Sequence, residues 1–525
     1  MMAADSLRRG LTANYLGKAF CALLALVTLP VLYRQLGAEA FGLFGLFFTV
    51  QALLGTFDFG VGAALQRDLA ALQARSNDPR PADVLATLTR VELILWVIAL
   101  LACAVAWLVS PFFVNHWLVV NSLPVSVVER SLVWMAIAAA LQLLGSFYIG
   151  CLNGLRHHTQ TNIIQSAVWA LRFVLLMLCV QVGVAAAGSM SLSVLQVLQA
   201  WAAANAVLVV WAKFRLKTAL PMPSAAIGIA YLAKAARFGL PLVAATTLIM
   251  LFNQVDKVAA SRLVPLEVLG KFTIVWSVAE VMYLMYQPIY TSFLPLFAAR
   301  FVGASDELGV AELSSSISLA WQMMCVAVLP VATVCFALSS LVITAWTGDA
   351  NLSSQTEVVL RWVITGSAIN AFLFIPFALQ QAAGDMRPWT WRIGAALLVY
   401  APLAVAAINV WGMPGAAAAW CIGSICLAAW LAKTTFNSLA GRGLSRLALK
   451  QLLAGSLKTL LICAVVSGLF AWLPMPSNRY AAMAFVLIAL GVCMLAALRS
   501  QPAVWMLVTS KLRDLQAPQS SDGKA

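Results

Sequence analysis

Long apolar stretches recur along this 525-residue sequence and limit what it can fold into. A helix needs about 20 mostly apolar residues to cross the hydrocarbon core of a bilayer. Only 10% of the residues are charged, against about 25% in soluble domains, so the chain has too few for a fully wet surface. These features predict an all-α polytopic membrane protein.

Fourteen stretches are long and apolar enough to span a membrane. The predicted spans are 15–33, 41–63, 88–110, 131–151, 162–183, 192–212, 236–259, 269–294, 314–337, 357–380, 392–411, 414–433, 452–473 and 480–498.

A short signature occurs twice and indicates an internal duplication. It reads Arg34-x4-Glu39-x2-Gly42-x-Phe44, and returns 228 residues later as Arg262-x4-Glu267-x2-Gly270-x-Phe272, each time after a long apolar stretch. Duplicated halves are a common plan in transporters. We therefore predict two six-helix lobes related as a parallel repeat, followed by two further helices. The predicted boundaries are an N-terminal lobe 1–212, a cytoplasmic linker 213–235, a C-terminal lobe 236–434, extra helices 435–498 and a cytoplasmic tail 499–525.

The basic residues predict the orientation of the chain. With both termini in the cytoplasm, Arg172 lies deep inside a span and most of the other basic residues are on the cytoplasmic side, as the positive-inside rule requires. The net charge of +14 then reflects loops beside anionic lipid and gives no indication of nucleic-acid binding. The outer side holds Arg34, Arg130, Lys257, Arg262, Lys271, Arg361 and Arg479.

Charged residues within spans are the best candidates for function, because each costs several kcal/mol unless it meets a cavity or a partner. Arg172 is about midway through the fifth span, where it would line a cavity or bind a ligand. The alternative is a structural pair with a carboxylate on a neighbouring helix. Lys18 is close enough to the cytoplasmic end of the first span for its side chain to reach the interface instead.

Three carboxylates in or near spans are candidates for coupling transport to protons or sodium. They are Asp58 in the second span, Asp256 in the seventh and Glu280 in the eighth. A carboxylate in a low dielectric can take up a proton near neutral pH. The alternative is an ion pair or a contact with a helix end, and Asp256 has Lys257 beside it.

Motifs for catalysis or cofactors do not occur in the sequence. There is no phosphate-binding loop, no GxSxG or HExxH motif and no CxxC pair among the ten cysteines. We expect no enzyme activity, no metal site and no cofactor beyond a coupling proton or sodium ion.

Several segments resemble the polysaccharide transporter family of the multidrug/oligosaccharidyl-lipid/polysaccharide exporter superfamily. The segments are 29–43, Phe57-Asp58-Phe59-Gly60 with Gln66-Arg67, 150–162, and Arg237 to Pro241 followed by Asp256-Lys257. The resemblance covers roughly residues 10–435. Members of this family are held to flip undecaprenyl-pyrophosphate-linked oligosaccharides across the bacterial inner membrane for O-antigen, capsule or exopolysaccharide synthesis.

The resemblance implies alternating access by rocking of the two lobes. Arg172, Lys257, Arg262 and Lys18 would then bind the substrate, with Arg172 donating to the pyrophosphate. It also implies contact with membrane lipids, and polymerase and chain-length proteins of the same pathway as partners.

Two other functions are open at this point. A cation-coupled drug or metabolite exporter of the same superfamily would share the fold, but fourteen spans and Arg172 favour the flippase. A membrane-embedded glycan polymerase or ligase would need a large outer loop with catalytic groups. The longest outer segment, about 111–130, offers only His116, Glu129 and Arg130.

Overall fold

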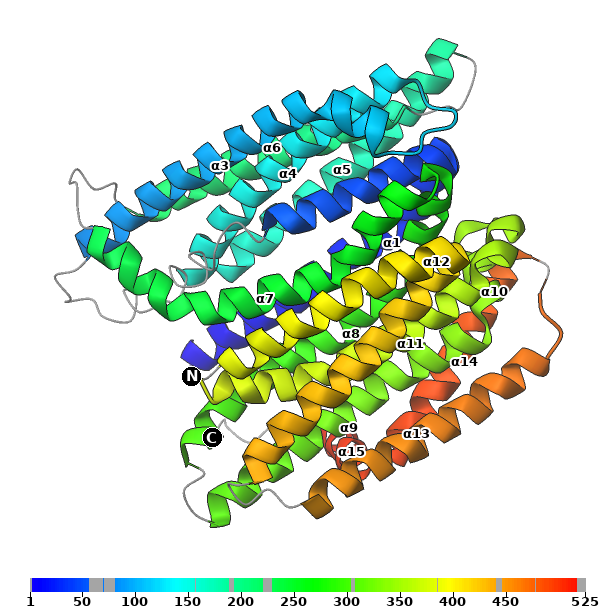
Figure 1. Ribbon diagram of the computed structural model, residues 1–525. Coiled ribbons are helices and arrows are strands. Elements are labelled where there is room, and N and C mark those ends of the chain that lie inside the picture. The colour runs from blue at the N-terminus through cyan, green and yellow to red at the C-terminus, as the bar shows by residue number, and fades with distance from the viewer. Residues whose placement is uncertain are drawn as a thin grey trace, which may run out of the picture. The chain divides into compact units, whose positions relative to one another are not determined.

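The computed structural model describes ten stretches of the chain, which are almost entirely helical (Figure 1). They are residues 2–55, 69, 81–155, 157–187, 193–220, 229–303, 307–384, 386–440, 446–476 and 478–516. Asp58 lies outside these described residues, and so does the side chain of Lys18.

Eleven helical segments in the described stretches are long and apolar enough to cross a membrane, which confirms the prediction of an all-α, multi-pass membrane protein. The full set of described helices, including those not counted among the eleven, is α1 (Met2–Gly55), α3 (Pro81–His116), α4 (Val125–Gly154), α5 (His158–Ala187), α6 (Val194–Ala219), α7 (Ile229–Leu263), α8 (Leu266–Gly303), α9 (Glu307–Ala337), α10 (Ser339–Thr347), α11 (Ala350–Ala382), α12 (Arg387–Ala440), α13 (Arg446–Trp472), α14 (Arg479–Ser500) and α15 (Pro502–Gln516).

Two of these helices each contain a sharp break at a glycine. Gly37 in α1 has φ 77° and ψ 167°, and Gly412 in α12 has φ 63° and ψ −141°. A side chain would be strained at these positive φ values, whereas glycine adopts them readily. Each break falls between two predicted spans, so α1 carries the first span and the described part of the second, and α12 carries the eleventh and twelfth.

The chain divides into two compact units. Unit 1 comprises residues 1–274 and 387–416, and unit 2 comprises residues 275–386 and 417–525. This division follows the packing of neighbouring helices, and its boundaries fall within α8 and α12. It does not test the predicted repeat of two six-helix lobes.

Unit 1 has a core built from α3, α4, α5 and α6, which lie side by side in Figure 1. Leu144, Tyr148 and Leu152 of α4 are fully buried in it. Tyr148 donates a 2.7 Å hydrogen bond to Glu92, which also pairs with the partly exposed Lys213 at 2.5 Å. A carboxylate, a phenol and an ammonium group thus satisfy one another where three helices meet.

Unit 2 packs α9 against α11, α13 and α14, and the short α10 against α11 and α14. Arg479, at the start of α14, donates to the carbonyl oxygens of Ala345 and Trp346 at 2.9 and 2.7 Å. It therefore satisfies the C-terminal end of α10, whose last carbonyls have no partner within their own helix.

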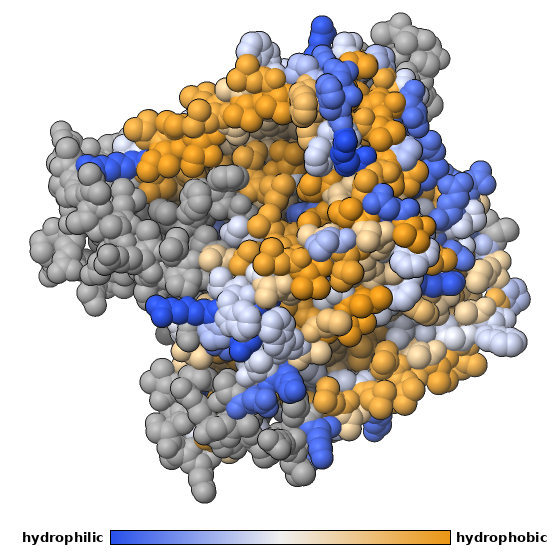
Figure 2. Space-filling view, viewed as in Figure 1, coloured by the Kyte–Doolittle hydropathy of each residue, from blue (hydrophilic) through white to orange (hydrophobic). Residues whose placement is uncertain are grey.

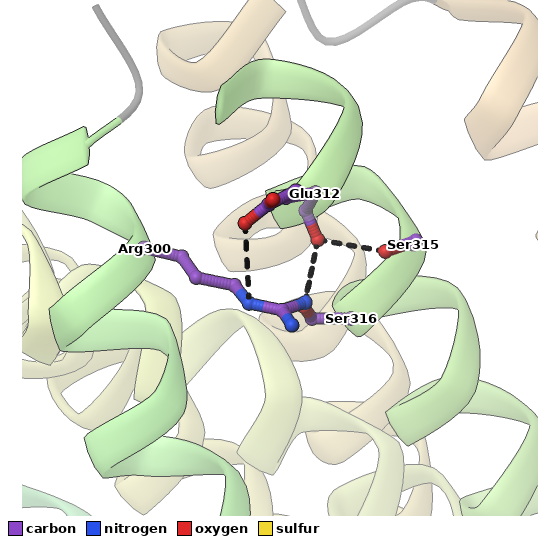
Figure 3. Close-up of polar contacts among 4 residues, drawn as sticks. All are labelled: Arg300, Glu312, Ser315 and Ser316. Carbon is purple, nitrogen blue, oxygen red and sulfur yellow. Dashed lines mark hydrogen bonds and ion pairs between the residues drawn. The ribbon is translucent and has the colours of Figure 1, made fainter. Parts of the chain in front are cut away.

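A second arginine joins α8 to α9 within unit 2 (Figure 3). Arg300 donates to the backbone carbonyl of Glu312 at 2.8 Å and to the hydroxyl of Ser316, and its Nε lies 4.0 Å from the Glu312 carboxylate. Because one guanidinium serves three acceptors on the neighbouring helix, it fixes the return of the chain from α8 into α9.

Apolar side chains cover much of the visible surface, and hydrophilic residues gather toward the helix ends (Figure 2). The pattern is clear on α3, where Leu93, Leu100, Trp107 and Leu108 are each more than half exposed. Surfaces of this kind are stable in hydrocarbon rather than in water.

Candidate functional site

The two copies of the duplicated signature pack directly against each other within unit 1. A Cβ atom on Gly42 would overlap the carbonyl of Leu266, and a Cβ atom on Gly270 would overlap the carbonyl of Ala38. A Cβ atom on Gly45 would meet the side chain of Thr273. The contacts are reciprocal, because residues 38 and 266, 42 and 270, and 45 and 273 are all 228 positions apart.

A carboxylate of the first signature ties down the loop after α3. Glu39, 8% exposed, accepts hydrogen bonds from the backbone N–H groups of Asn121, at 2.6 Å, and Ser122, at 2.9 Å, as well as from the Ser122 hydroxyl. Its repeat counterpart Glu267 is instead half-exposed and pairs with Lys271 at 2.6 Å. The duplicated glutamates therefore have different roles.

The same loop also reaches the second signature. The N–H of Leu266 donates to the carbonyl of Val119 at 3.0 Å, and the indole of Trp117 donates to Ser261 at 3.0 Å. Arg262, a predicted substrate-binding residue, is exposed and lies over the Trp117 ring at 5.5 Å. The structure thus places Arg262 close along the chain to the contact between Gly42 and Gly270, hereafter the glycine crossing. In this stretch, an aromatic residue and backbone groups of the loop after α3 contact residues 261–266.

Arg172 is buried between α4, α5 and α6, with 6% of its surface exposed. Its guanidinium donates to the side-chain oxygens of Gln142 at 2.9 Å and of Asn205 at 2.5 Å. Asn205 is itself held by a 2.7 Å hydrogen bond from its amide to the carbonyl of Ala138. The sequence alternative for Arg172, an ion pair with a carboxylate, is not what the described side chains provide, because these partners are neutral.

Two tryptophans enclose the same guanidinium. Its Cζ lies 4.7 Å from the ring centre of Trp169 and 4.8 Å from that of Trp201. Such cation–π contacts stabilise a desolvated cation by about 2 kcal/mol. The Nε of Arg172 is buried without a hydrogen-bond partner among the described residues. The arrangement therefore holds a positive charge in the span, with neutral acceptors that a phosphate could replace.

Asp256 is the more enclosed of the two predicted coupling residues that the structure describes. It is fully buried on α7, and both carboxylate oxygens lack a hydrogen-bond partner among the described side chains and backbone. Tyr400 of α12, whose hydroxyl is likewise buried and without a partner in the described region, stacks on Phe252, one turn before Asp256. Lys257 is half-buried and donates to the carbonyl of Asn253 at 3.4 Å.

Glu280 differs from Asp256 in its exposure. The structure places it on an exposed face of α8 in unit 2, next to buried Ala279. The predicted site residues thus fall in three places. Arg172 is on α5, Asp256, Lys257 and Arg262 share α7, and Glu280 is on α8.

The residues that surround Arg172 were not among the predicted site residues. Gln142 and Asn205 are amides inside predicted spans, and Trp169 lies one helical turn before Arg172. Uncharged amides and aromatic residues occur often in membrane helices, so the sequence does not single these residues out. Only the folded structure shows that all of them contact Arg172.

Comparison with known proteins finds one matching family and several solved structures with a similar fold. The family described as polysaccharide biosynthesis protein matches residues 7–301. A Shigella flexneri protein named "Putative O-antigen transporter" is 23% identical over 421 residues, which is 78% of this chain and 93% of that protein.

Solved structures share the fold at low identity. An inward-facing multidrug resistance transporter of the MATE family, in the MOP superfamily, has a TM-score of 0.67 at 13% identity, covering 81% of this chain and 96% of its own. The lipid II flippase MurJ in an inward closed conformation has a TM-score of 0.66 at 13% identity, covering 92% of this chain and 98% of its own.

Among the described residues, no group of three or more metal-ligating side chains is found.

Proposed function

Because the chain belongs to the polysaccharide biosynthesis protein family, we propose that it is a flippase for lipid-linked oligosaccharides. Its substrate is an undecaprenyl-pyrophosphate-linked oligosaccharide, which it moves from the cytoplasmic to the periplasmic leaflet for O-antigen, capsule or exopolysaccharide synthesis. The match of the family over more than half of the chain is the observation that carries this proposal. The likeness to an O-antigen transporter by name supports it.

The physical problem that such a protein solves is the cost of a polar headgroup in lipid. A sugar chain and a pyrophosphate would each lose their hydration in hydrocarbon, at several kcal/mol or more for the charge alone. A transporter lowers this cost by offering hydrogen-bonding groups and positive charge inside the membrane, and the lipid tail can stay in the bilayer.

We assign the pyrophosphate to Arg172. In this structure two neutral amide side chains accept hydrogen bonds from its guanidinium, and two indole rings pack against it. A phosphate oxygen is a stronger acceptor than an amide oxygen because it is charged. A movement of the helices that opens this site would therefore let phosphate displace Gln142 or Asn205. Lys257 and Arg262 of α7 would contact the headgroup on the outer side, and Lys18 near the cytoplasmic side.

The test is transfer of a fluorescent undecaprenyl-pyrophosphate oligosaccharide in proteoliposomes. Arg172→Ala removes a charged hydrogen bond of about 1.5–3 kcal/mol, so the rate should fall roughly 10- to 100-fold. Arg172→Lys keeps the charge but lacks the forked guanidinium geometry, so its transfer rate should lie between those of the wild type and Arg172→Ala. Arg479→Ala is the control and should transfer at the wild-type rate, because among the described residues this arginine donates to backbone carbonyls of α10.

Two outcomes would contradict parts of the proposal. If a folded Arg172→Ala protein transferred the lipid at the wild-type rate, Arg172 would not be a substrate-binding residue. An absence of transfer by the wild type, with several glycans and with proton and sodium gradients, would contradict the flippase itself. Size-exclusion profiles and melting temperatures establish that each variant is folded.

We assign ion coupling to Asp256, because a fully buried carboxylate whose oxygens lack a hydrogen-bond partner among the described residues is suited to bind a proton or sodium ion. Glu280 and Asp58 are the other coupling candidates. The same observation on Asp256 favours the second candidate function, a cation-coupled exporter of drugs or metabolites. Efflux of a fluorescent cationic dye under a proton or sodium gradient, without lipid-linked sugar transfer, would identify that function.

The proposal also covers location and partners. A substrate built on the cytoplasmic leaflet places the protein in the bacterial inner membrane, with both termini cytoplasmic. Its product is consumed on the other side, which makes the polymerase and the chain-length protein of the same pathway the expected neighbours. It acts as a transporter without chemistry of its own.

A further inference from the structure

One face of α8 in unit 2 combines exposed polar and aromatic residues in a membrane-spanning helix. Glu280, Tyr283, Leu284, Gln287 and Thr291 follow one another at helical spacing and so share one side of the helix. Tyr283 is 47% exposed, and Glu280 and Thr291 are also exposed. The opposite side is closed, since Met282, Tyr286, Ile289 and Phe293 are all buried.

Hydrocarbon is a poor neighbour for this face. A carboxylate against lipid tails costs several kcal/mol, and an amide adds to that cost. The face is therefore suited to water or to a polar ligand. It differs in this respect from α3, whose exposed side chains from Leu93 to Phe112 are all apolar.

The aromatic part of the face is held rigidly from behind. The ring of Tyr283 contacts that of Tyr286 edge-on at 5.4 Å, and Tyr286 packs on Phe374 of α11 at 4.6 Å. Tyr290 contacts Phe374 as well and donates a 2.6 Å hydrogen bond to Gln381. Rings supported in this way lose little conformational entropy when a ligand stacks on them.

Two prolines add hydrogen-bond acceptors to the same side. Pro288 and Pro295 have no N–H, so they cannot donate to the carbonyls of Leu284 and Thr291, four residues earlier. Both of those residues are on the exposed face. Backbone carbonyls, a carboxylate and an amide together offer several acceptors for hydroxyl groups beside an apolar ring.

We propose that this face of α8 binds the saccharide portion of the substrate, an inference that rests on the proposed function. The apolar C–H side of a sugar ring stacks on Tyr283. Glu280 and Gln287 accept hydrogen bonds from its hydroxyl groups. Recognition of the sugar is thereby separated from recognition of the pyrophosphate at Arg172.

Two lipid probes test this separation on the full-length protein in nanodiscs. One is undecaprenyl pyrophosphate, and the other is the oligosaccharide-bearing lipid extracted from cells that synthesise such glycans. Tyr283→Ala should weaken binding of the sugar-bearing probe by roughly tenfold and leave the sugarless probe unchanged. Tyr283→Phe keeps the ring and should bind both probes as the wild type does. Glu280→Gln should weaken only the sugar-bearing probe.

Each other outcome has a distinct meaning. Equal affinities of wild type and Tyr283→Ala for the sugar-bearing probe overturn the saccharide site and leave the flippase intact. A loss of both probes in a folded Tyr283→Ala variant also overturns it, because the effect would not follow the sugar. If the wild type binds neither probe, the proposed function fails and the saccharide site fails with it.

Discussion

The crossing of the two signatures predicts a specific response to the smallest substitution that the chain allows. Gly42→Ala adds one methyl group where the neighbouring atoms are the carbonyl of Leu266 and the backbone nitrogen of Gly270. Backbone atoms cannot rotate away as a side chain can, so the two helices must separate. Overpacking of this kind costs about 1–3 kcal/mol, and the rigidity of both partners favours the upper end.

An opposing effect has to be removed by a control. Alanine is about 0.8–1.0 kcal/mol better than glycine inside a helix, so Gly42→Ala gains on propensity while it loses on packing. Gly150 in α4 is a matched position, because a Cβ atom there meets nothing within 4 Å. The propensity gain is the same at both positions, so the difference between Gly42→Ala and Gly150→Ala should be the overpacking cost, about 1–3 kcal/mol in the free energy of unfolding.

Thermal unfolding in detergent measures this difference. An unfolding entropy of about 2.1 cal/mol/K per residue over the 525-residue chain converts it to a melting temperature roughly 1–3 °C lower for Gly42→Ala than for Gly150→Ala. Gly270→Ala should behave like Gly42→Ala. The double variant should cost less than the sum of the two, because the first methyl group has already separated the helices. Equal melting temperatures for Gly42→Ala and Gly150→Ala, or full additivity in the double variant, would refute the close crossing.

Two further predictions concern carboxylates. Glu39→Gln replaces two charge-assisted acceptors of backbone N–H groups and should destabilise the protein by about 1.5–3 kcal/mol in thermal unfolding. Its repeat counterpart, Glu267→Gln, should change stability by less than about 1 kcal/mol because that side chain is half-exposed, and equal effects of the two would contradict the difference in their roles. Asp256→Asn should make the rate of transfer in proteoliposomes independent of the proton or sodium gradient, and a gradient response equal to that of the wild type would remove Asp256 from coupling.

The helices of this protein are predictable from sequence because each span must be apolar over its whole length. That requirement is local, and it gives the separate spans before and after the breaks at Gly37 and Gly412. Packing is harder to predict. In a membrane the face toward lipid is as apolar as the face toward protein, so no polar stripe marks which side of α4 meets α6.

The candidate site shows the same limit. The cost of a charge in a span was enough to single out Arg172 and Asp256, and both are buried. It could not give their surroundings. Arg172 has amide and indole neighbours from three helices, whereas a carboxylate was the expected structural partner. The exposed position of Glu280 follows from how α8 packs on α11, which no local pattern contains.

The reciprocal contact between the signatures bears on the history of the chain. Gly42 contacts Gly270, its counterpart in the second signature; Leu266 contacts Gly42 in the same way that Ala38 contacts Gly270. A contact in which each residue meets its equivalent is the kind formed by two identical subunits about a two-fold axis. For the duplicated chain that the repeated signature predicts, this glycine crossing would correspond to the interface of a homodimer of half-length chains. The two signature glutamates differ in that arrangement, because Glu39 accepts from backbone N–H groups whereas Glu267 pairs with Lys271.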